Sequence, residues 1–485
     1  MTTEPSRRVD WRMLLSNPAP SRSLVIGGDA NWRREVAGAL AAAGLEVASV
    51  PGDRAAGAMG EADLVVARAD GSIGGDLLRR RVPTRASLVI EQPSSVAPWA
   101  RIDRPHSNIV AWPRLGAATE LVPVRSPDGR HLFAERRARR GGARGRVAGL
   151  ALRLPWPHPA GRILLATDGG AGSALREVAC QHAGRDELSG AEPWTLITPG
   201  FRASRHVVLL MGRRHVLKVA RHAGDRSVEH EAQVLRAAAG RPGARVPDVI
   251  AVDDVGGHRV LVETRVPGRD LTPSRVRRAP EAYAGLVAAW LRQLSTGPAP
   301  MIESWRRQLV DEPIAELRAL GSGAIEPALL QQADGLMGGL RSAPGLIRAI
   351  EHGDVGDPNL LVDADGRLGV IDWELGRTDG VALLDLLFAL GYFAGASARA
   401  RDAAEHAEAW ERVVLRPGGW GHALLRREAA AIGLDALLIR PLLILCWVRQ
   451  LARLAARVGG GPAAADTVRG HRHLAILRTS IERLT

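Results

Sequence analysis

Short apolar runs alternate with amphipathic segments over residues 22–113. Apolar runs at 23–28, 46–50, 63–66 and 87–91 predict strands, and residues 32–43 have the spacing of a helix. Strands that alternate with helices favour a parallel, doubly wound sheet, whose ligand site would lie at the carboxyl ends of the strands, near Gly27, Gly28 and Asp29. We therefore expect a small α/β (Rossmann-like) domain in this part of the chain.

The pattern changes after residue 190, where short strand-like runs are followed by long helical segments. Helices are predicted at 228–238, 381–393, 399–415, 420–432, 435–458 and 463–484. Residues 184–193 are polar and rich in turn formers, so we expect the main boundary near 185–192. The expected parts are an N-terminal tail at 1–20, the α/β domain with an Arg-rich linker at 21–185, and an α+β domain at 186–485 that folds around its own core.

Composition and charge exclude several classes of protein. Apolar residues make up 46% and charged residues 24%, which is ordinary for a soluble globular chain. The net charge of +13 comes from arginines spread along the chain without aromatic platforms, which disfavours nucleic acid as a partner. The two cysteines lack the spacing of a metal site or a disulfide framework, which fits the cytoplasm. The longest apolar stretch, 436–448, is broken by Arg440 and Pro441 and is too short to span a membrane.

Lys218 is the one lysine among the 65 Lys plus Arg of the chain. Arginine replaces lysine readily on a solvated surface, so a lysine that remains indicates a place where the two residues differ. A compact ammonium differs from a planar guanidinium where a phosphate is held at close range. Lys218 lies in the strand-like run 215–220, and its chemistry predicts a contact with phosphate.

A second motif supplies carboxylates. The run His352-Gly353-Asp354 is followed by Asn359, and Asp372 comes at the end of the next apolar run. Phosphoryl transfer needs a group that orients the acceptor hydroxyl and metal ions that neutralise the phosphates. Asp354 suits the first task, and the oxygen ligands of Asn359 and Asp372 suit Mg²⁺.

In order and spacing, these motifs resemble the aminoglycoside phosphotransferase and choline kinase-like family over residues 193–400. The resemblance implies a protein kinase-like, two-lobed fold, with an N-lobe at about 193–266 and a C-lobe at about 267–485. It implies an ATP- and Mg²⁺-dependent phosphotransferase that acts on an alcohol group. Residues 21–185 faintly resemble a degenerate methyltransferase-like domain.

The resemblance also assigns roles to single residues. Lys218 corresponds to the lysine that contacts the nucleotide, and Glu231 to the glutamate that orients it. Ser204 belongs to the loop that covers the phosphates, while Glu263 and Arg265 lie at the hinge against which adenine packs. Asp354 corresponds to the catalytic carboxylate with His352 as its orienting neighbour, and Asn359 and Asp372 correspond to the metal ligands. Asp385 is expected to support the catalytic loop through its backbone.

Three functions remain open on the sequence alone. The first is an O-phosphotransferase whose acceptor is a sugar, a glycan precursor or another small hydroxyl compound. The acceptor is expected to be neutral or anionic, because residues 377–485 contain 15 Arg against 10 Asp plus Glu. The second is a catalytically weak kinase-like protein that binds a nucleotide or metabolite and acts as a regulator or partner. The third is a bifunctional protein whose N-terminal domain binds a nucleotide or S-adenosylmethionine.

Overall fold

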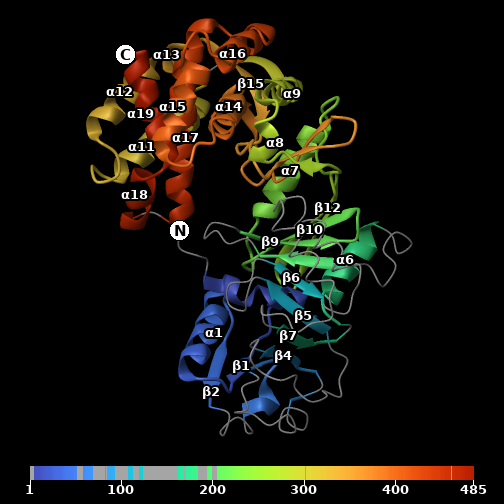
Figure 1. Cartoon of the computed structure of the whole chain (residues 1–485). Coiled ribbons are helices and arrows are strands. Elements are labelled where there is room, and N and C mark those ends of the chain that lie inside the picture. Colours follow the sequence, from blue (N-terminus) through green and yellow to red (C-terminus); the bar gives the residue numbers. More distant parts are fainter. Residues whose placement is uncertain are drawn as a thin grey trace. The chain divides into compact units, whose positions relative to one another are not determined.

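The computed structural model divides the chain into two compact units, each considered by itself (Figure 1). The sheet unit comprises Thr2–Ala232 and Val249–Arg265, and the helical unit comprises Gln233–Asp248 and Val266–Thr485. The structure describes residues 5–51, 58–68, 82–83, 85–92, 107–112, 120–123, 162–168, 170–183, 194–198, 205–300, 302–459 and 461–485. The Arg-rich segment 136–146 and the expected boundary at 185–192 lie outside these residues.

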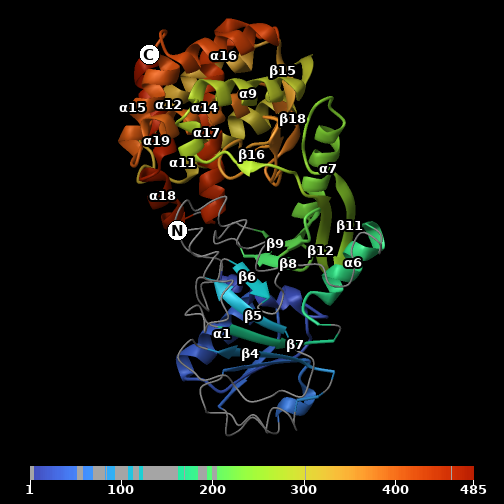
Figure 2. The same ribbon diagram turned by 45° about the vertical axis from the view of Figure 1, so that its right-hand side comes forward.

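The described strands of the sheet unit form one sheet of twelve strands. Four neighbouring parallel strands begin the sheet, as the sequence predicts: β2 (Val47–Val50), β1 (Ser23–Ile26), β3 (Leu64–Arg68) and β4 (Ser87–Gln92). The remaining strands follow in antiparallel pairs in the order β7 (Arg162–Ala166), β5 (Ser107–Trp112), β6 (Glu120–Pro123), β8 (Trp194–Ile197), β9 (His206–Met211), β10 (His215–Ala220), β12 (His258–Thr264) and β11 (Val249–Val255). Figure 2 shows this succession from β4 to β11. The sheet therefore does not end at the expected domain boundary.

One apolar core runs along this sheet. It joins Val25 on β1 to Val262 on β12, and it includes residues of η1 (Pro5–Leu14), α1 (Ala30–Ala42) and α6 (Ser173–Ala183). A second core, around Leu24 and Ile26, lies on the opposite face of the parallel strands, with Met59 of η3 (Met59–Glu61). The continuous core explains why the structure divides the chain differently from the sequence expectation.

The N-terminal segment corrects a second expectation. Residues 5–14 form a 3-10 helix instead of a tail, and Val9, Trp11 and Met13 are buried in the core. Asp10 is also buried, where it accepts two hydrogen bonds from Arg221 at 3.0 and 2.9 Å. The segment is polar in composition but its apolar residues alternate with charged ones that find partners inside the unit, so it packs against the sheet.

The carboxyl edge of the parallel strands is occupied by the chain's own side chains. Asp29 accepts from the Trp32 amide at 2.8 Å, which caps the start of α1. The Trp32 indole donates to Glu91 at 2.9 Å, and the Arg68 guanidinium carbon lies 5.8 Å from the Trp32 ring centroid. Gly28 has φ +65° and faces the Trp32 ring. The described residues at this edge satisfy one another, which favours a structural role for it.

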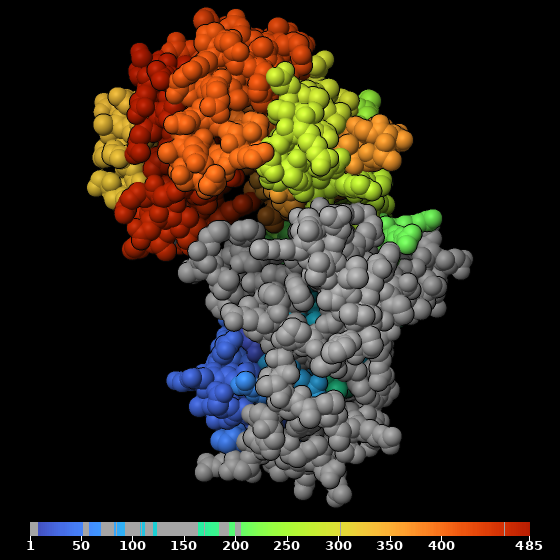
Figure 3. Space-filling model, in the orientation of Figure 1, coloured from blue at the N-terminus to red at the C-terminus, as the bar shows by residue number. Residues whose placement is uncertain are grey.

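The helical unit packs around α14 (Leu384–Ala398) and α17 (Ile439–Val458). Buried side chains lie all around α14 and along most of α17, which fits central positions in the bundle. α15 (Ala403–Trp410) and α19 (Arg472–Leu484) lie beside each other and are seen as adjoining orange and red surfaces in Figure 3. Among the described residues, no helix combines the length and apolarity needed to cross a membrane.

Shorter elements complete the helical unit. One three-stranded sheet consists of β13 (Arg269–Asp270), β16 (Leu360–Val362) and β17 (Leu368–Val370). A second consists of β14 (Ser295–Pro300), β15 (Gly345–Glu351) and β18 (Arg377–Val381). α7 (Ser227–Ala239) begins in the sheet unit and ends in the helical unit. The other helices are α8 (Pro273–Val276), α9 (Pro280–Gln293), α10 (Glu303–Arg306), η4 (Arg307–Asp311), α11 (Glu312–Ala319), α12 (Pro327–Leu336), α13 (Gly338–Ser342), η5 (Glu411–Leu415), α16 (Trp420–Ala431), η6 (Ala436–Leu438) and α18 (Gly461–Arg469).

Candidate active site

The sheet unit holds the predicted lysine-glutamate pair. Lys218 lies on β10, Glu231 lies on α7, and the Lys218 ammonium forms an ion pair with Glu231 Oε1. Both side chains are buried, with exposures of 5% and 0%. A buried ion pair is strongly destabilised when one partner is removed, so Glu231 fixes both the charge and the position of the ammonium. The structure contains the ion pair that the resemblance implied, and the role of Lys218 towards a nucleotide stays a prediction.

The residues predicted at the adenine hinge lie at the end of β12. Glu263 is buried on this strand, opposite Val216, and Arg265 follows the strand with its amide donating to the Arg214 carbonyl at 2.6 Å. Arg265 is also the last residue of the sheet unit. Their role in binding a nucleotide stays a prediction. Ser204 lies outside the described residues.

The helical unit brings Asp354 and Asn359 together in the loop between β15 and β16. Asn359 is buried, and its amide nitrogen donates to the Asp354 backbone carbonyl at 3.1 Å and to its carboxylate at 3.3 Å. Asp354 is half-buried, so its carboxylate remains accessible. Because the amide nitrogen faces Asp354, the amide oxygen of Asn359 is the atom that can serve a metal ion.

His352 orients this loop from a fully buried position. Its Nδ1 accepts from the Asp354 amide at 3.2 Å, so Nε2 carries the proton that is donated to the Ile371 carbonyl at 2.9 Å. The imidazole also packs edge-on against Trp373, with ring centroids 4.7 Å apart. With both nitrogens engaged by the backbone, His352 positions Asp354 and is not placed to accept a proton from a substrate.

Asp372 follows β17 in a left-handed backbone conformation, with φ 70°. A non-glycine residue in this conformation is strained, and such strain is concentrated at functional sites. The preceding Ile371 amide donates to the Asn359 carbonyl at 3.0 Å, which ties the two segments together.

The donor set fits Mg²⁺. The described residues contain no group of three or more His, Cys, Asp or Glu side chains arranged to hold a metal ion. Mg²⁺ does not require such a cage, because it is commonly held by one or two protein oxygens together with waters and nucleotide phosphates. Asn359 and Asp372 supply hard oxygen donors of the required kind.

Asp385, on α14, holds the start of the catalytic loop. Its two carboxylate oxygens accept from the amides of His352 at 2.6 Å and Gly353 at 2.8 Å, as the sequence predicts for a supporting residue. Burial, with a contribution from the nearby Glu351 charge, raises the pKa of the Asp385 carboxyl. The loop is therefore fixed by a carboxylate that the fold buries at a free-energy cost.

Sequence reasoning missed a second support, which comes from α17. Arg449 forms two hydrogen bonds to Glu351, at 2.9 and 2.8 Å, and Arg453 donates to the Gly353 carbonyl at 2.9 Å. Burial alone would raise the pKa of Glu351, but Arg449 and Arg453 lower it to about 2. The signal in the sequence is the arginine pair, which interrupts the otherwise apolar face of a predicted core helix.

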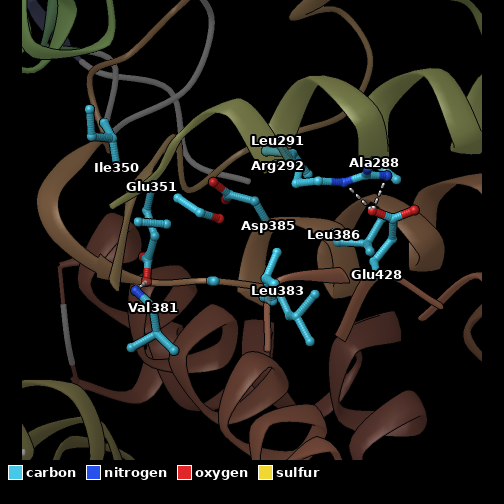
Figure 4. A pocket seen from close by; sticks show the side chains of 14 residues that line it. Ala288, Leu291, Arg292, Ile350, Glu351, Val381, Leu383, Asp385, Leu386 and Glu428 are labelled. Atoms are coloured by element: carbon cyan, nitrogen blue, oxygen red, sulfur yellow. Dashed lines mark hydrogen bonds and ion pairs between the residues drawn. The ribbon is translucent and has the colours of Figure 1, made fainter. Parts of the chain in front are cut away.

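A small pocket lies beside this support (Figure 4). Glu351 and Asp385 form part of its wall, together with apolar residues of α9, β15 and α14. Arg292 on α9 pairs with the buried Glu428 on α16 at 2.7 Å, at the other side of the pocket. The pocket therefore borders the side chains that position the catalytic loop.

Comparison with known proteins matches residues 194–421 to the model of a family described as the phosphotransferase enzyme family. The viomycin phosphotransferase of Streptomyces vinaceus is 29% identical over 218 residues, which cover 39% of this chain and 75% of that protein. A crystal structure of a thermostable mutant of aminoglycoside phosphotransferase APH(4)-Ia with ADP and hygromycin B covers 62% of this chain and 98% of its own, at 18% identity and a TM-score of 0.40. An ethanolamine kinase of Plasmodium vivax covers 64% of this chain and 87% of its own, at 11% identity and a TM-score of 0.41.

The matched segment contains every residue assigned above to phosphoryl transfer, from Lys218 on β10 to Asp372 after β17. It does not include the parallel strands β1 to β4, so the resemblance of the N-terminal part to a methyltransferase-like domain has no support from it. Residues 194–421 match the model of the phosphotransferase enzyme family, and the protein is a small-molecule kinase that transfers phosphate to a hydroxyl group.

Proposed function

We propose that the protein is an ATP- and Mg²⁺-dependent O-phosphotransferase whose acceptor is a hydroxyl of a small metabolite, such as a sugar or a glycan precursor. The observation that carries the proposal is the catalytic loop. Its Asp354 is accessible and is contacted by the Asn359 amide. The Asp354 backbone amide donates to His352, whose own amide donates to Asp385. A carboxylate fixed in this way is suited to orient a hydroxyl and to accept its proton.

The other residues divide the remaining tasks. Lys218, fixed by Glu231, binds the nucleotide phosphates in the sheet unit. The Asn359 amide oxygen and the Asp372 carboxylate would hold Mg²⁺, which neutralises phosphate charge when it is bound. Within the catalytic loop, Asp354 and Asn359 are held in place before the substrates bind, so little reorganisation of the loop accompanies the transfer.

The proposed acceptor is neutral or anionic. A polycationic acceptor requires carboxylates, whereas the part of the chain from Arg377 to Thr485 has 15 Arg and 10 Asp plus Glu. This feature favours a metabolite over a polycationic drug, and the proposed location is the cytoplasm, where ATP is available. The relatives named above include drug-modifying enzymes, but their acceptors are properties of those proteins.

A metabolite library tests the proposal. The protein would be incubated with the library, ATP and Mg²⁺, and phosphorylated products would be identified by mass, with Asp354→Asn as the matched blank. We expect at least one product that depends on the enzyme, on Mg²⁺ and on Asp354. If ATP stabilises the protein thermally but no library member is phosphorylated, the alternative of a nucleotide-binding regulator is favoured instead.

A further inference from the structure

Two helices of the bundle, α14 and α19, meet beside the catalytic loop. A Cβ placed on Gly356, two residues after Asp354, would lie 3.8 Å from Tyr392 and 3.9 Å from Phe388, both on α14. The Phe388 ring in turn packs against the His473 ring of α19, with centroids 5.9 Å apart. The first turn of α19 is therefore adjacent to the loop that carries Asp354.

Arg472 is the first residue of α19, and it is exposed. Within the part of the chain that the structure describes, its guanidinium makes no ion pair or hydrogen bond. Arg277, exposed at the end of α8, is also without a side-chain partner there. By contrast, Arg478, further along α19, binds Glu326 at 2.9 Å. Arg472 thus differs from Arg478 in having no carboxylate within ion-pair distance among the described residues.

Both arginines interact electrostatically with groups of this region. Burial lowers the pKa of Arg472 from the ordinary value for arginine, and the charge of Asp354 acts in the opposite direction. Burial, and next the Asp357 charge, raise the pKa of Tyr392, while Arg277 acts in the opposite direction. Tyr392 is therefore a neutral phenol, and its hydroxyl donates to the Leu271 carbonyl at 2.8 Å.

The histidines of this region add no positive charge at neutral pH. Burial, followed by the charge of Arg472, lowers the pKa of His471 to about 4, and the same two causes lower the pKa of His406. Of the side chains named in this region of α8, α14 and α19, Arg472 and Arg277 are therefore the ones that carry positive charge. The negative charges that act on this region include the carboxylates of Asp354 and Asp357.

We propose, on the basis of the phosphotransferase activity proposed above, that the acceptor carries an oxyanion, which Arg472 binds with help from Arg277 while the acceptor hydroxyl lies at Asp354. A guanidinium presents a planar fork of donors that matches a carboxylate or a phosphate ester. In the transfer, the bond from the γ-phosphorus to its bridging oxygen breaks, a bond to the acceptor oxygen forms, and the hydroxyl proton passes to Asp354. Arg472 is then a specificity-determining residue that lies beyond the segment matched by the family model.

Matched acceptors test the proposal. The full-length protein with Mg-ATP would be assayed on glycerol, glycerate and glycerol 3-phosphate, on glucose, gluconate and glucose 6-phosphate, and on hygromycin B as a cationic probe. ADP release and product mass would be measured. We expect kcat/KM to be at least about 10-fold higher for an anionic member than for its neutral partner. The carboxylate and phosphate arms identify which oxyanion is preferred.

Variants at two arginines of α19 complete the test. We expect Arg472→Gln to raise KM for the preferred anionic acceptor by about 10- to 100-fold, with KM for Mg-ATP unchanged. Arg472→Lys should restore part of the loss, and the control Arg478→Gln should leave both KM values as they are. If neutral or cationic probes are preferred, or if Arg472→Gln behaves as Arg478→Gln does, the inference is wrong while phosphotransfer stands. Absence of turnover with every probe, together with absence of nucleotide binding, would overturn both.

Discussion

At the scale of single residues, Lys218 is the position where the sequence and the structure agree most directly. Its ammonium is buried on β10 and paired with Glu231 on α7. We expect Lys218→Arg to lower kcat/KM for Mg-ATP by about 100-fold or more, because a planar guanidinium cannot occupy the place of the ammonium between Glu231 and phosphate. Steady-state kinetics would measure the loss.

The matched control for this exchange is Arg226→Lys. Arg226 is exposed just before α7 and pairs with Glu229 in the first turn of that helix, so the exchange should change neither turnover nor stability. If Lys218→Arg retains the nucleotide affinity and turnover of the wild type, the assigned role of Lys218 is wrong.

Substitutions of Asp354 and Asp372 are expected to affect different steps, turnover in the first case and binding of the Mg²⁺-nucleotide complex in the second. Asp354→Asn should lower turnover by about 100- to 1000-fold while a non-hydrolysable ATP analogue with Mg²⁺ still binds, since Asp354 acts on the acceptor proton. Asp372→Asn should weaken binding of the same analogue by about 10-fold, and only when Mg²⁺ is present. Calorimetric titration separates the two, with the exposed Asp365→Asn as a control. Identical titrations for Asp354→Asn and Asp372→Asn would contradict the assignment.

The sequence predicted these residues because their signals are local. Asp354 and Asn359 are five positions apart in one loop, and the Lys218–Glu231 pair joins neighbouring elements. The pair Glu351–Arg449 joins residues 98 positions apart, and nothing local specifies which arginine of the bundle Glu351 meets. Such a contact depends on how α17 crosses β15, which tertiary packing decides.

At the scale of elements, the helices after Asp372 were predicted well except at their breaks. The segment expected as one helix at 463–484 consists of α18, ending at Arg469, and α19, beginning at Arg472. The apolar spacing continues across the break, so periodicity alone did not reveal it. Gly470 lies between the two helices, and His471 caps α19 by accepting from the His473 amide at 3.2 Å. This break is what brings Arg472 to a helix start beside the catalytic loop.

The contact of α17 with β15 leads to a prediction about stability. Glu351→Gln would leave the buried Arg449 and its neighbour Arg453 without their shared carboxylate, and we expect the free energy of unfolding to fall by about 3–5 kcal/mol. Urea unfolding would measure the change. The exposed pair offers a control, because Glu326→Gln removes the partner of Arg478 at the surface and should cost little.

The same variant has a defined pH dependence. The folded protein lowers the pKa of Glu351 from 4.5 to about 2, so the carboxylate stabilises the fold above pH 4.5. The stabilisation is lost as the pH falls from 4.5 towards about 2. The difference in the free energy of unfolding between the wild type and Glu351→Gln should therefore be constant above pH 5. It should become smaller as the pH falls below that value. A difference that grows in acid would contradict the ion pair.

At the scale of the whole molecule, the sequence predicted the composition of the sheet unit but not its extent. The parallel strands β1 to β4 and the antiparallel strands that carry Lys218 were each expected, as parts of separate domains. Their union depends on β6 pairing with β8, where Leu121 lies opposite Leu196. Neither strand is more than four residues long, and the intervening chain contains the polar segment that suggested a boundary. Pairing between two such short runs has no signature in a single sequence.

A fragment that begins at Asp186 tests whether the sheet unit is one folding unit. It would keep Lys218, Glu231 and Asp354, but it would leave β8 unpaired on one side and expose the core face of β9, β10 and β12. It would also remove Asp10 from the fully buried Arg221. We expect the fragment to be insoluble, or to unfold without a cooperative transition, in contrast to the full-length chain.

Asp10→Asn in the full-length chain separates loss of the buried charge from loss of the sheet. We expect it to lower the free energy of unfolding by about 3 kcal/mol, since Arg221 then loses the carboxylate charge of Asp10 in an environment where Arg12 is a second buried cation. The sheet and the core would remain, so nucleotide binding should persist. A fragment from Asp186 that folds cooperatively and binds Mg-ATP as the full-length chain does would contradict this expectation. It would show that strands β8 to β12 fold without the N-terminal part of the sheet. In that case the shared core would be an interface between two domains instead of the interior of one unit.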